Sequence, residues 1–113
     1  MVSELRIFTI NRGSMEAFLG AWFRGVYPLR LRHGYAIQGP WVIPERNEFL
    51  WIVSYDGPES WEAKERAYYA SAERVAMDPD PRQYIAKYEH HFLTPVSPPE
   101  QGTVSASDAP RSA

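Results

Sequence analysis

The chain has 113 residues and a net charge of −2, from 14 acidic and 12 basic side chains. This length fits a single domain, and the charge balance argues against a nucleic-acid-binding protein, which needs a concentrated basic field. The chain contains no cysteine, which excludes disulfides and Cys-based metal or redox sites. Its first residues form no signal peptide and no long apolar run follows, so we expect a cytoplasmic protein without a membrane partner.

The four Trp, seven Tyr and five Phe residues all precede residue 97. The stretch that follows is mostly Pro, Ser and Ala and has little to bury, so it cannot offset the entropy lost on ordering. We therefore predict a folded domain over residues 1–96 and a flexible tail over 97–113. The aromatic residues of the domain either supply core and dimer area or also line a pocket for a flat, apolar ligand.

The first predicted elements are a strand and a helix. Alternation of apolar with charged or aromatic residues over 4–10 predicts a strand. A turn at 11–13 leads to Ser14, a candidate N-cap. Helical spacing then continues to Gly34, with a kink or a new short turn expected at Pro28. The apolar stripe of this helix comprises Met15, Phe18, Leu19, Trp22 and Val26.

Basic residues gather in the second half of this helix, at Arg24, Arg30, Arg32 and His33. Cations near a helix C-terminus interact favourably with the helix dipole. The cluster is therefore either a solvated face that matches the dipole or an anion-binding patch.

Two further strands follow. The segment 35–44 reads as a strand that Gly39-Pro40 interrupts, which predicts an edge strand or a bulge. The segment 47–55 is apolar on both faces, so both faces should be covered. An Asp-Gly-Pro turn at 56–58 then leads into a second helix.

The second helix has an approximate apolar stripe and ends in a proline-containing segment at 77–83. A short turn at 84–85 precedes the last predicted strand, 88–96. The stripe comprises Trp61, Tyr68, Ala72 and Val75.

The resulting order is β-α-β-β-α-β, which predicts an α+β fold of the ferredoxin-like type, with an antiparallel sheet and both helices on one face. The other face of the sheet then needs a cover. A second copy of the chain is the simplest cover, so we expect a homodimer.

Three segments together resemble NIPSNAP-type domains: ELRIFTINRGSMEAFLGAWFRGVYPLRLRHG, NEFLWIVSYDGPESWEAKERAYYA and DPRQYIAKYEHHFLTPV. The likeness covers residues 2–96 in the family's order, although Phe8 stands where the family commonly has Tyr. It implies a dimeric α/β barrel whose pocket lies between the sheet and the helices of each protomer. That superfamily includes cofactor-free monooxygenases, haem-degrading enzymes, isomerases and dehydratases, so the resemblance does not choose a reaction.

His90 and His91 are adjacent in the last predicted strand, so their side chains should point to opposite faces of the sheet. At most one of them can then belong to the pocket, and we favour His90, which shares its face with Tyr88 and Phe92. Each histidine is either a hydrogen-bonded structural residue or a proton-transfer group, for which its ordinary pKa near 6.5 is suited.

Arg6 is the third catalytic candidate. In a ferredoxin-like sheet the first strand lies between the third and fourth strands, so Arg6 could meet Glu48 on one side or His90 or His91 on the other. It either forms a structural ion pair or holds a substrate oxygen that gains negative charge. The candidate substrate-binding residues are Trp22, Tyr35, Trp51, Tyr68 and Tyr69.

We expect no metal and no other cofactor. The chain lacks Cys and has no His pair at the spacing of a metal-binding helix. Haem degradation in the superfamily that it resembles uses a histidine on a helix as iron ligand, and the second predicted helix has none.

These observations predict that the protein binds a small organic molecule of aromatic or polyketide-like type in a pocket within each protomer. The first hypothesis is a cofactor-independent monooxygenase or a proton-transfer enzyme such as an isomerase or cyclase. The alternative is a non-catalytic module that binds a small molecule or another protein, through the same pocket or the basic end of the first helix.

Overall fold

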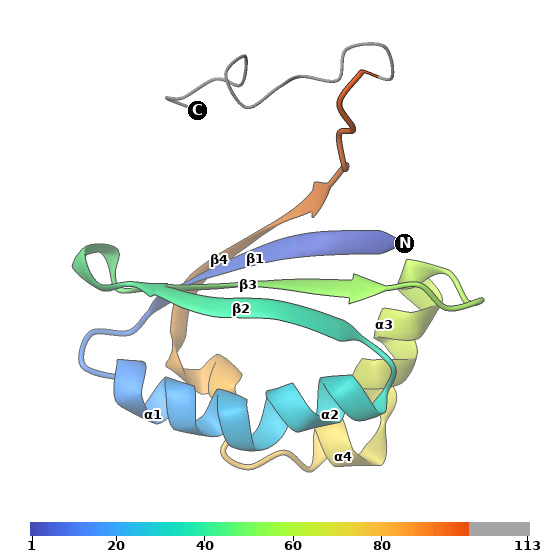
Figure 1. Ribbon diagram of the computed structural model, residues 1–113. Helices are drawn as coiled ribbons and strands as arrows, with labels where there is room; N and C mark the ends of the chain where they lie inside the picture. Colours follow the sequence, from blue (N-terminus) through green and yellow to red (C-terminus); the bar gives the residue numbers. More distant parts are fainter. Residues whose placement is uncertain (100–113) are drawn as a thin grey trace.

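The computed structural model describes residues 1–99, which form one antiparallel sheet with all helices on one of its faces (Figure 1). The sheet has four strands in the order β2-β3-β1-β4. The strands are β1 (Val2–Ile10), β2 (Ala36–Ile43), β3 (Glu48–Tyr55) and β4 (Ile85–Leu93). The predicted α+β, ferredoxin-like fold is confirmed. Most of the predicted tail over 97–113 lies outside the described residues.

The first helical segment consists of α1 (Met15–Ala21), a π-helical turn (Trp22–Val26) and α2 (Tyr27–Arg32). The irregular turn lies before Pro28, and Pro28 does not cause it. Pro28 lies in the first turn of α2, where its missing N–H needs no partner. Ser14 occupies the N-cap position, but its side chain accepts no hydrogen bond. The Ser14 side chain therefore does not cap the helix, and the prediction that it would is wrong.

The second predicted helix is two helices, α3 (Trp61–Ala70) and α4 (Ala72–Val75). Ser71 is extended and its hydroxyl oxygen accepts from the backbone N–H of Arg74, so it starts a new helix. Because the predicted apolar stripe assumed one continuous helix, its last member is not buried: Val75 is 73% exposed. A 3₁₀ turn (Pro81–Tyr84) follows, and β4 begins and ends three residues earlier than predicted.

The edge strand β2 carries the predicted irregularity. Its register with β3 shifts between Gln38 and Trp41, and Gly39 has a φ of 93°, which favours glycine. A second 3₁₀ turn (Pro44–Arg46) connects β2 to β3. Within residues 1–99, no helix combines the length and the hydrophobicity needed to cross a membrane. The cytoplasmic location stays a prediction.

The core lies between the sheet and the helices and is built largely from aromatic rings. Phe49 of β3 is fully buried, and its ring centroid lies 4.8 Å from that of Phe18 and 5.0 Å from that of Trp22. Trp22 in turn packs edge-on against Trp51, at 5.2 Å. Such edge-to-face pairs are the favoured aromatic geometry, and they fix the helical segment across the sheet.

The opposite face of the sheet is not covered by any helix of the described residues (Figure 1). Leu5 pairs with Ile52 across β1 and β3, and Ile7 pairs with Leu50, so these four apolar side chains share that face. Trp41 of β2 pairs with Leu50 on the same side and is 52% exposed. We call this surface the open sheet face.

Candidate functional site

A cleft of about 860 Å³ lies between the β1–β4 half of the sheet and helix α3. Strands β1 and β4 form its floor, because alternate residues of each strand point toward the helices. Its lining residues are Glu4, Arg6, Phe8, Trp61, Glu62, Glu65, Tyr69, Arg82, Tyr88, His90 and Phe92.

A chain of ion pairs crosses the bottom of the cleft. The Arg6 Nε donates to Glu4 Oε1 at 2.6 Å, and Arg6 Nη2 donates to Glu65 Oε1 at 2.6 Å. The other oxygen of Glu65 accepts from Arg30. These side chains alternate in charge, from β1 through α3 to α2, so each arginine is neutralised by a carboxylate.

Burial makes this network electrostatically strong. Arg30 is only 1% exposed, and its guanidinium carbon lies 3.8 Å from the ring centroid of Tyr68. Burial raises the pKa of Glu65, but the hydrogen bond and charge of Arg30 and the charge of Arg6 outweigh it, so the pKa is lowered. Burial lowers the pKa of Arg6, but Tyr69, Glu65 and Glu4 outweigh it and raise the pKa. Glu65 and Arg6 therefore both remain charged at neutral pH.

Tyr69 connects this network to the open part of the cleft. Its hydroxyl oxygen accepts from Arg30 Nη2 at 3.2 Å and from Arg6 Nη1 at 3.4 Å. Because two guanidinium groups occupy its lone pairs, the hydroxyl has its proton left to donate. Tyr69 is 40% exposed and lines the cleft, so a ligand oxygen could receive that proton.

His90 lies beside the network on β4, directly opposite Arg6 of β1. Its Nδ1 is 3.1 Å from Glu4 Oε2, while the side chain remains 54% exposed. Glu4 itself is 3% exposed and is held in place by Arg6. The pairing fixes the orientation of the imidazole and leaves Nε2 as the nitrogen available to a ligand.

Aromatic side chains form the walls of the cleft. Trp61 of α3 and Phe92 of β4 meet edge-on at 5.9 Å. The rings of Tyr88 and His90 lie nearly parallel, 6.0 Å apart and inclined by 18°. Such walls favour a flat, apolar ligand body, whereas the charged floor favours polar groups at its end.

The structure brings three of the predicted site residues, Arg6, His90 and Tyr69, into this cleft. His91 does not join them, because it points to the open sheet face, where its Nε2 lies 2.9 Å from Glu89. The hydrogen bond with His91 lowers the pKa of Glu89. Arg6 does not meet Glu48, which pairs with Thr9 and lies on the other face.

The other predicted substrate-binding residues are buried in the core and do not line the cleft. Trp22, Trp51 and Tyr68 line an inner cavity of about 40 Å³, and each is at most 2% exposed. Tyr35 lines neither space. Helical spacing correctly marked Trp22 and Tyr68 as inward-facing, but sequence periodicity does not distinguish a core position from a pocket wall.

Sequence reasoning did not predict the network that Glu4, Arg30 and Glu65 form, and it placed Arg30 only in the basic cluster of the first helix. Arg30 and Glu65 follow a pattern that could have revealed them: Arg30 is four residues after buried Val26, and Glu65 is four residues after buried Trp61. A charged residue in the apolar stripe of a helix indicates a buried ion pair, because isolated charges are costly to bury.

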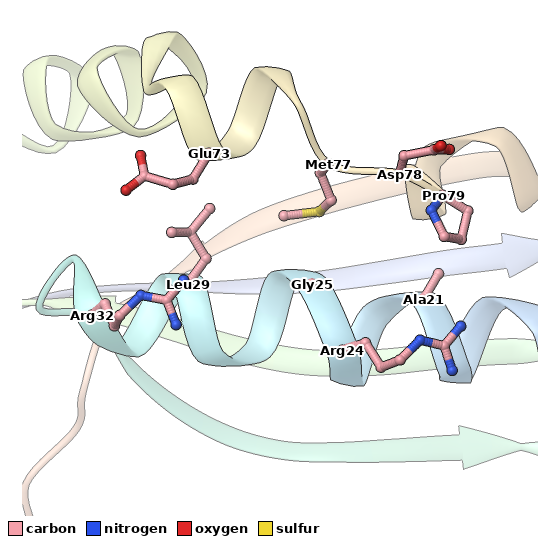
Figure 2. A pocket seen from close by; sticks show the side chains of 9 residues that line it. All are labelled: Ala21, Arg24, Gly25, Leu29, Arg32, Glu73, Met77, Asp78 and Pro79. Atoms are coloured by element: carbon pink, nitrogen blue, oxygen red, sulfur yellow. The ribbon is translucent and has the colours of Figure 1, made fainter.

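A second, smaller pocket of about 250 Å³ lies away from the sheet. It is bounded by the first helical segment, from α1 to α2, on one side and by α4 and the chain that follows it on the other. Figure 2 shows Met77 lying over Gly25, where an added Cβ would approach the Met77 sulfur to 2.7 Å. Arg24, Arg32, Glu73 and Asp78 line this pocket. It contains no aromatic residue and none of the predicted catalytic or substrate-binding residues, although Arg24 and Arg32 belong to the basic cluster of the first helical segment. It is therefore the weaker candidate for a site that binds an aromatic molecule. Within residues 1–99, no group of three or more potential ligands is placed to hold a metal.

Comparisons with known proteins identify the fold. No protein-family model matches the sequence, and no curated protein matches it. A NIPSNAP domain protein from Burkholderia xenovorans is 21% identical, with a TM-score of 0.74 over 86% of this chain and 96% of that one. A NIPSNAP family protein from Agrobacterium tumefaciens is 16% identical, with a TM-score of 0.74 over 84% and 85%.

The structures that match also include an antibiotic biosynthesis monooxygenase, which is 13% identical. Its TM-score is 0.64, over 86% of this chain and all (100%) of that one. These identities are low, so the likeness concerns the fold. The chain has a NIPSNAP-like, ferredoxin-like fold.

Proposed function

We propose that the protein binds a small organic molecule with a flat, aromatic body in the cleft and catalyses proton transfer on it. The observation that carries this proposal is the hydrogen-bonded pair of Glu4 and His90 beside an aromatic-walled cleft. A histidine is the usual proton-transfer group at neutral pH.

The roles follow from the hydrogen bonds. His90 donates its Nδ1 proton to the Glu4 carboxylate, so the lone pair of Nε2 accepts a proton from an acidic C–H or O–H of the ligand. Negative charge then develops on a ligand oxygen, which the Tyr69 hydroxyl stabilises by donating to it. Arg6 and Arg30 position Tyr69 and supply positive charge nearby.

Return of the proton to a different ligand atom completes an isomerisation. In a cyclisation the deprotonated carbon instead attacks a carbonyl carbon of the same ligand, the C=O π bond opens, and the carbonyl oxygen takes the proton. In a cofactor-independent monooxygenase, the same deprotonated ligand would instead be oxidised by O₂. Both reactions begin with the step that His90 and Tyr69 support. The structural likeness to an antibiotic biosynthesis monooxygenase is consistent with either one.

The experiment uses 2-tetralone, a flat bicyclic ketone with acidic C–H groups, in D₂O. We expect the protein to accelerate deuterium incorporation, followed by ¹H NMR, above the rate in protein-free buffer. His90→Asn should lower this rate about 10²-fold or more, the usual weight of a general base. Tyr69→Phe should lower it about 10²-fold, since removing an oxyanion donor has that effect.

His91→Asn is the matched control, because it makes the same change one residue away on the other face of the sheet. It should leave the rate unchanged. Equal rates for His90→Asn and His91→Asn would overturn the catalytic proposal. Saturable binding of 2-tetralone without exchange would favour the non-catalytic alternative.

We also infer that a second copy of the chain covers the open sheet face. Leu5, Ile7, Leu50 and Ile52 gather there, and Trp41 is half exposed beside them. Continuous apolar surface of this kind marks an interaction site, and a self-complementary dimer is the commonest assembly. Sedimentation velocity at micromolar concentration should show a dimer that Leu50→Glu dissociates. A stable monomer of the unsubstituted protein would contradict the inference.

A further inference from the structure

The inner cavity adjoins the cleft, and four residues line both spaces: Arg6, Phe8, Tyr69 and Arg82. It extends from there into the core between the sheet and the α1–α2 segment. The residues that line only the inner cavity are Phe18, Trp22, Val26, Arg30, Trp51, Tyr68, Arg74 and Pro81. The cavity is therefore an extension of the candidate site toward the core.

Five of these residues carry a buried polar atom without a hydrogen-bond partner among the described residues. The atoms are Trp22 Nε1, Trp51 Nε1, Tyr68 Oη, Arg30 Nε and Arg74 Nε. Each of these side chains is at most 4% exposed. Leaving one buried donor unpaired costs about 1–3 kcal/mol, so five around one cavity require an explanation.

All five groups can donate a hydrogen bond, and four of them can only donate. Burial raises the pKa of Tyr68, so its hydroxyl also keeps its proton at neutral pH. The residues that line the cavity thus carry a set of unpaired donors, and the natural occupant of the cavity is an acceptor.

The charged residues that line the inner cavity also favour an acceptor. Four arginines and no acidic residue line the inner cavity. The carboxylates that pair with these arginines, Glu4, Glu65 and Asp80, lie outside its lining. Four cations thus face three carboxylates, and the excess charge is positive. Such a space excludes a cation and suits an anion.

The volume sets the size of that anion. A cavity of about 40 Å³ accommodates one or two water molecules, so the anion must be a small group such as a carboxylate. We propose that the inner cavity is a carboxylate-binding subsite, and that the ligand of the cleft is an aromatic carboxylic acid whose ring lies between the aromatic walls. This inference rests on the proposed function, since it assigns the second half of the same ligand.

The test compares the binding of benzoate, benzyl alcohol and acetate by isothermal titration calorimetry. Benzoate combines ring and carboxylate, benzyl alcohol has the ring alone, and acetate has the carboxylate alone. We expect benzoate to bind at least tenfold more tightly than either fragment. Tyr68→Phe should weaken benzoate about tenfold or more, the weight of a hydrogen bond to a charged group, and should leave benzyl alcohol unaffected.

Tyr35→Phe is the matched control. Tyr35 is also a buried tyrosine whose ring lies beside the Arg30 guanidinium, but it lines neither space. It should bind benzoate as the unsubstituted protein does. Both variants retain the aromatic ring, and equal thermal midpoints would show that they fold alike.

The outcomes separate this inference from the proposed function. Equal affinities for benzoate and benzyl alcohol, unchanged by Tyr68→Phe, would overturn the subsite while leaving an aromatic ligand in the cleft. Acetate binding that Tyr68→Phe weakens, without any binding of benzyl alcohol, would support the subsite and contradict the aromatic ligand. Equal losses in Tyr68→Phe and Tyr35→Phe would overturn the subsite.

Discussion

Glu65 is the residue on which the buried charges of the cleft depend. It accepts hydrogen bonds from both Arg6 and Arg30, and Arg30 is 1% exposed. Glu65→Gln keeps the shape and one acceptor oxygen but leaves the two arginines without their shared counter-charge. Removing one partner of a buried ion pair costs about 3–5 kcal/mol, and we expect a loss at the lower end, about 3 kcal/mol, because the amide oxygen still accepts.

Urea denaturation measured by tryptophan fluorescence checks this value, since Trp22 and Trp51 are buried. With an unfolding slope of about 2 kcal/mol per molar urea, the midpoint should fall by about 1.5 M. Glu62→Gln makes the same change on an exposed position of α3 and should shift stability by less than about 0.5 kcal/mol. Both variants are compared at one protein concentration, because a dimer unfolds in a concentration-dependent way. Equal midpoints for the two variants would refute the role of Glu65.

Three further predictions concern stability. Because the pKa of Glu65 is lowered in the folded protein, its stabilising effect is complete above its ordinary pKa of 4.5 and is lost as the pH falls through the lower folded value. The urea concentration at the unfolding midpoint should therefore decrease as the pH is lowered from 4.5, and it should decrease less steeply in Glu65→Gln. Phe49→Ala should cost about 3–5 kcal/mol in the same assay because it empties a fully buried position, whereas the half-exposed Phe23→Ala should cost far less. Ser60→Ala should cost about 1 kcal/mol, because the Ser60 hydroxyl accepts from the Ala63 N–H at 3.1 Å. Ser14→Ala should leave stability nearly unchanged, since Ser14 makes no such bond. If Ser14→Ala lowered the thermal midpoint as much as Ser60→Ala, the assignment of Ser60 as a helix cap and Ser14 as a non-capping residue would be contradicted.

The fold could be predicted from the sequence because its patterns are local. Alternation marked β1, a run that is apolar on both faces marked β3, helical spacing marked α1 and α3, and Gly39-Pro40 marked the irregular edge strand. The errors lie where a single capping hydrogen bond decides, which apolar spacing does not record. The hydroxyl of Ser71 divides the second helix, and nothing in the apolar stripe announces that division.

The site was less predictable. Strand alternation correctly separates His90 from His91 but does not say which face the helices cover, because both faces of β1 carry apolar residues. The deciding partners come from distant segments: Glu65 and Arg30 are 35 positions apart and meet only after folding. Glu4 and Arg6 then become the inward face because a buried counter-charge is available to them there.

The central claim is that the ligand site is the cleft that contains His90. The most direct test is a ¹H–¹³C NMR titration with benzoate that follows the Cε1–H signals of His90 and His91, assigned by single substitution. The His90 signal should shift in a saturable way, because its ring lines the cleft, while the His91 signal on the opposite face stays unchanged. A fixed His90 signal under saturating benzoate, or an equal shift of His91, would contradict the account.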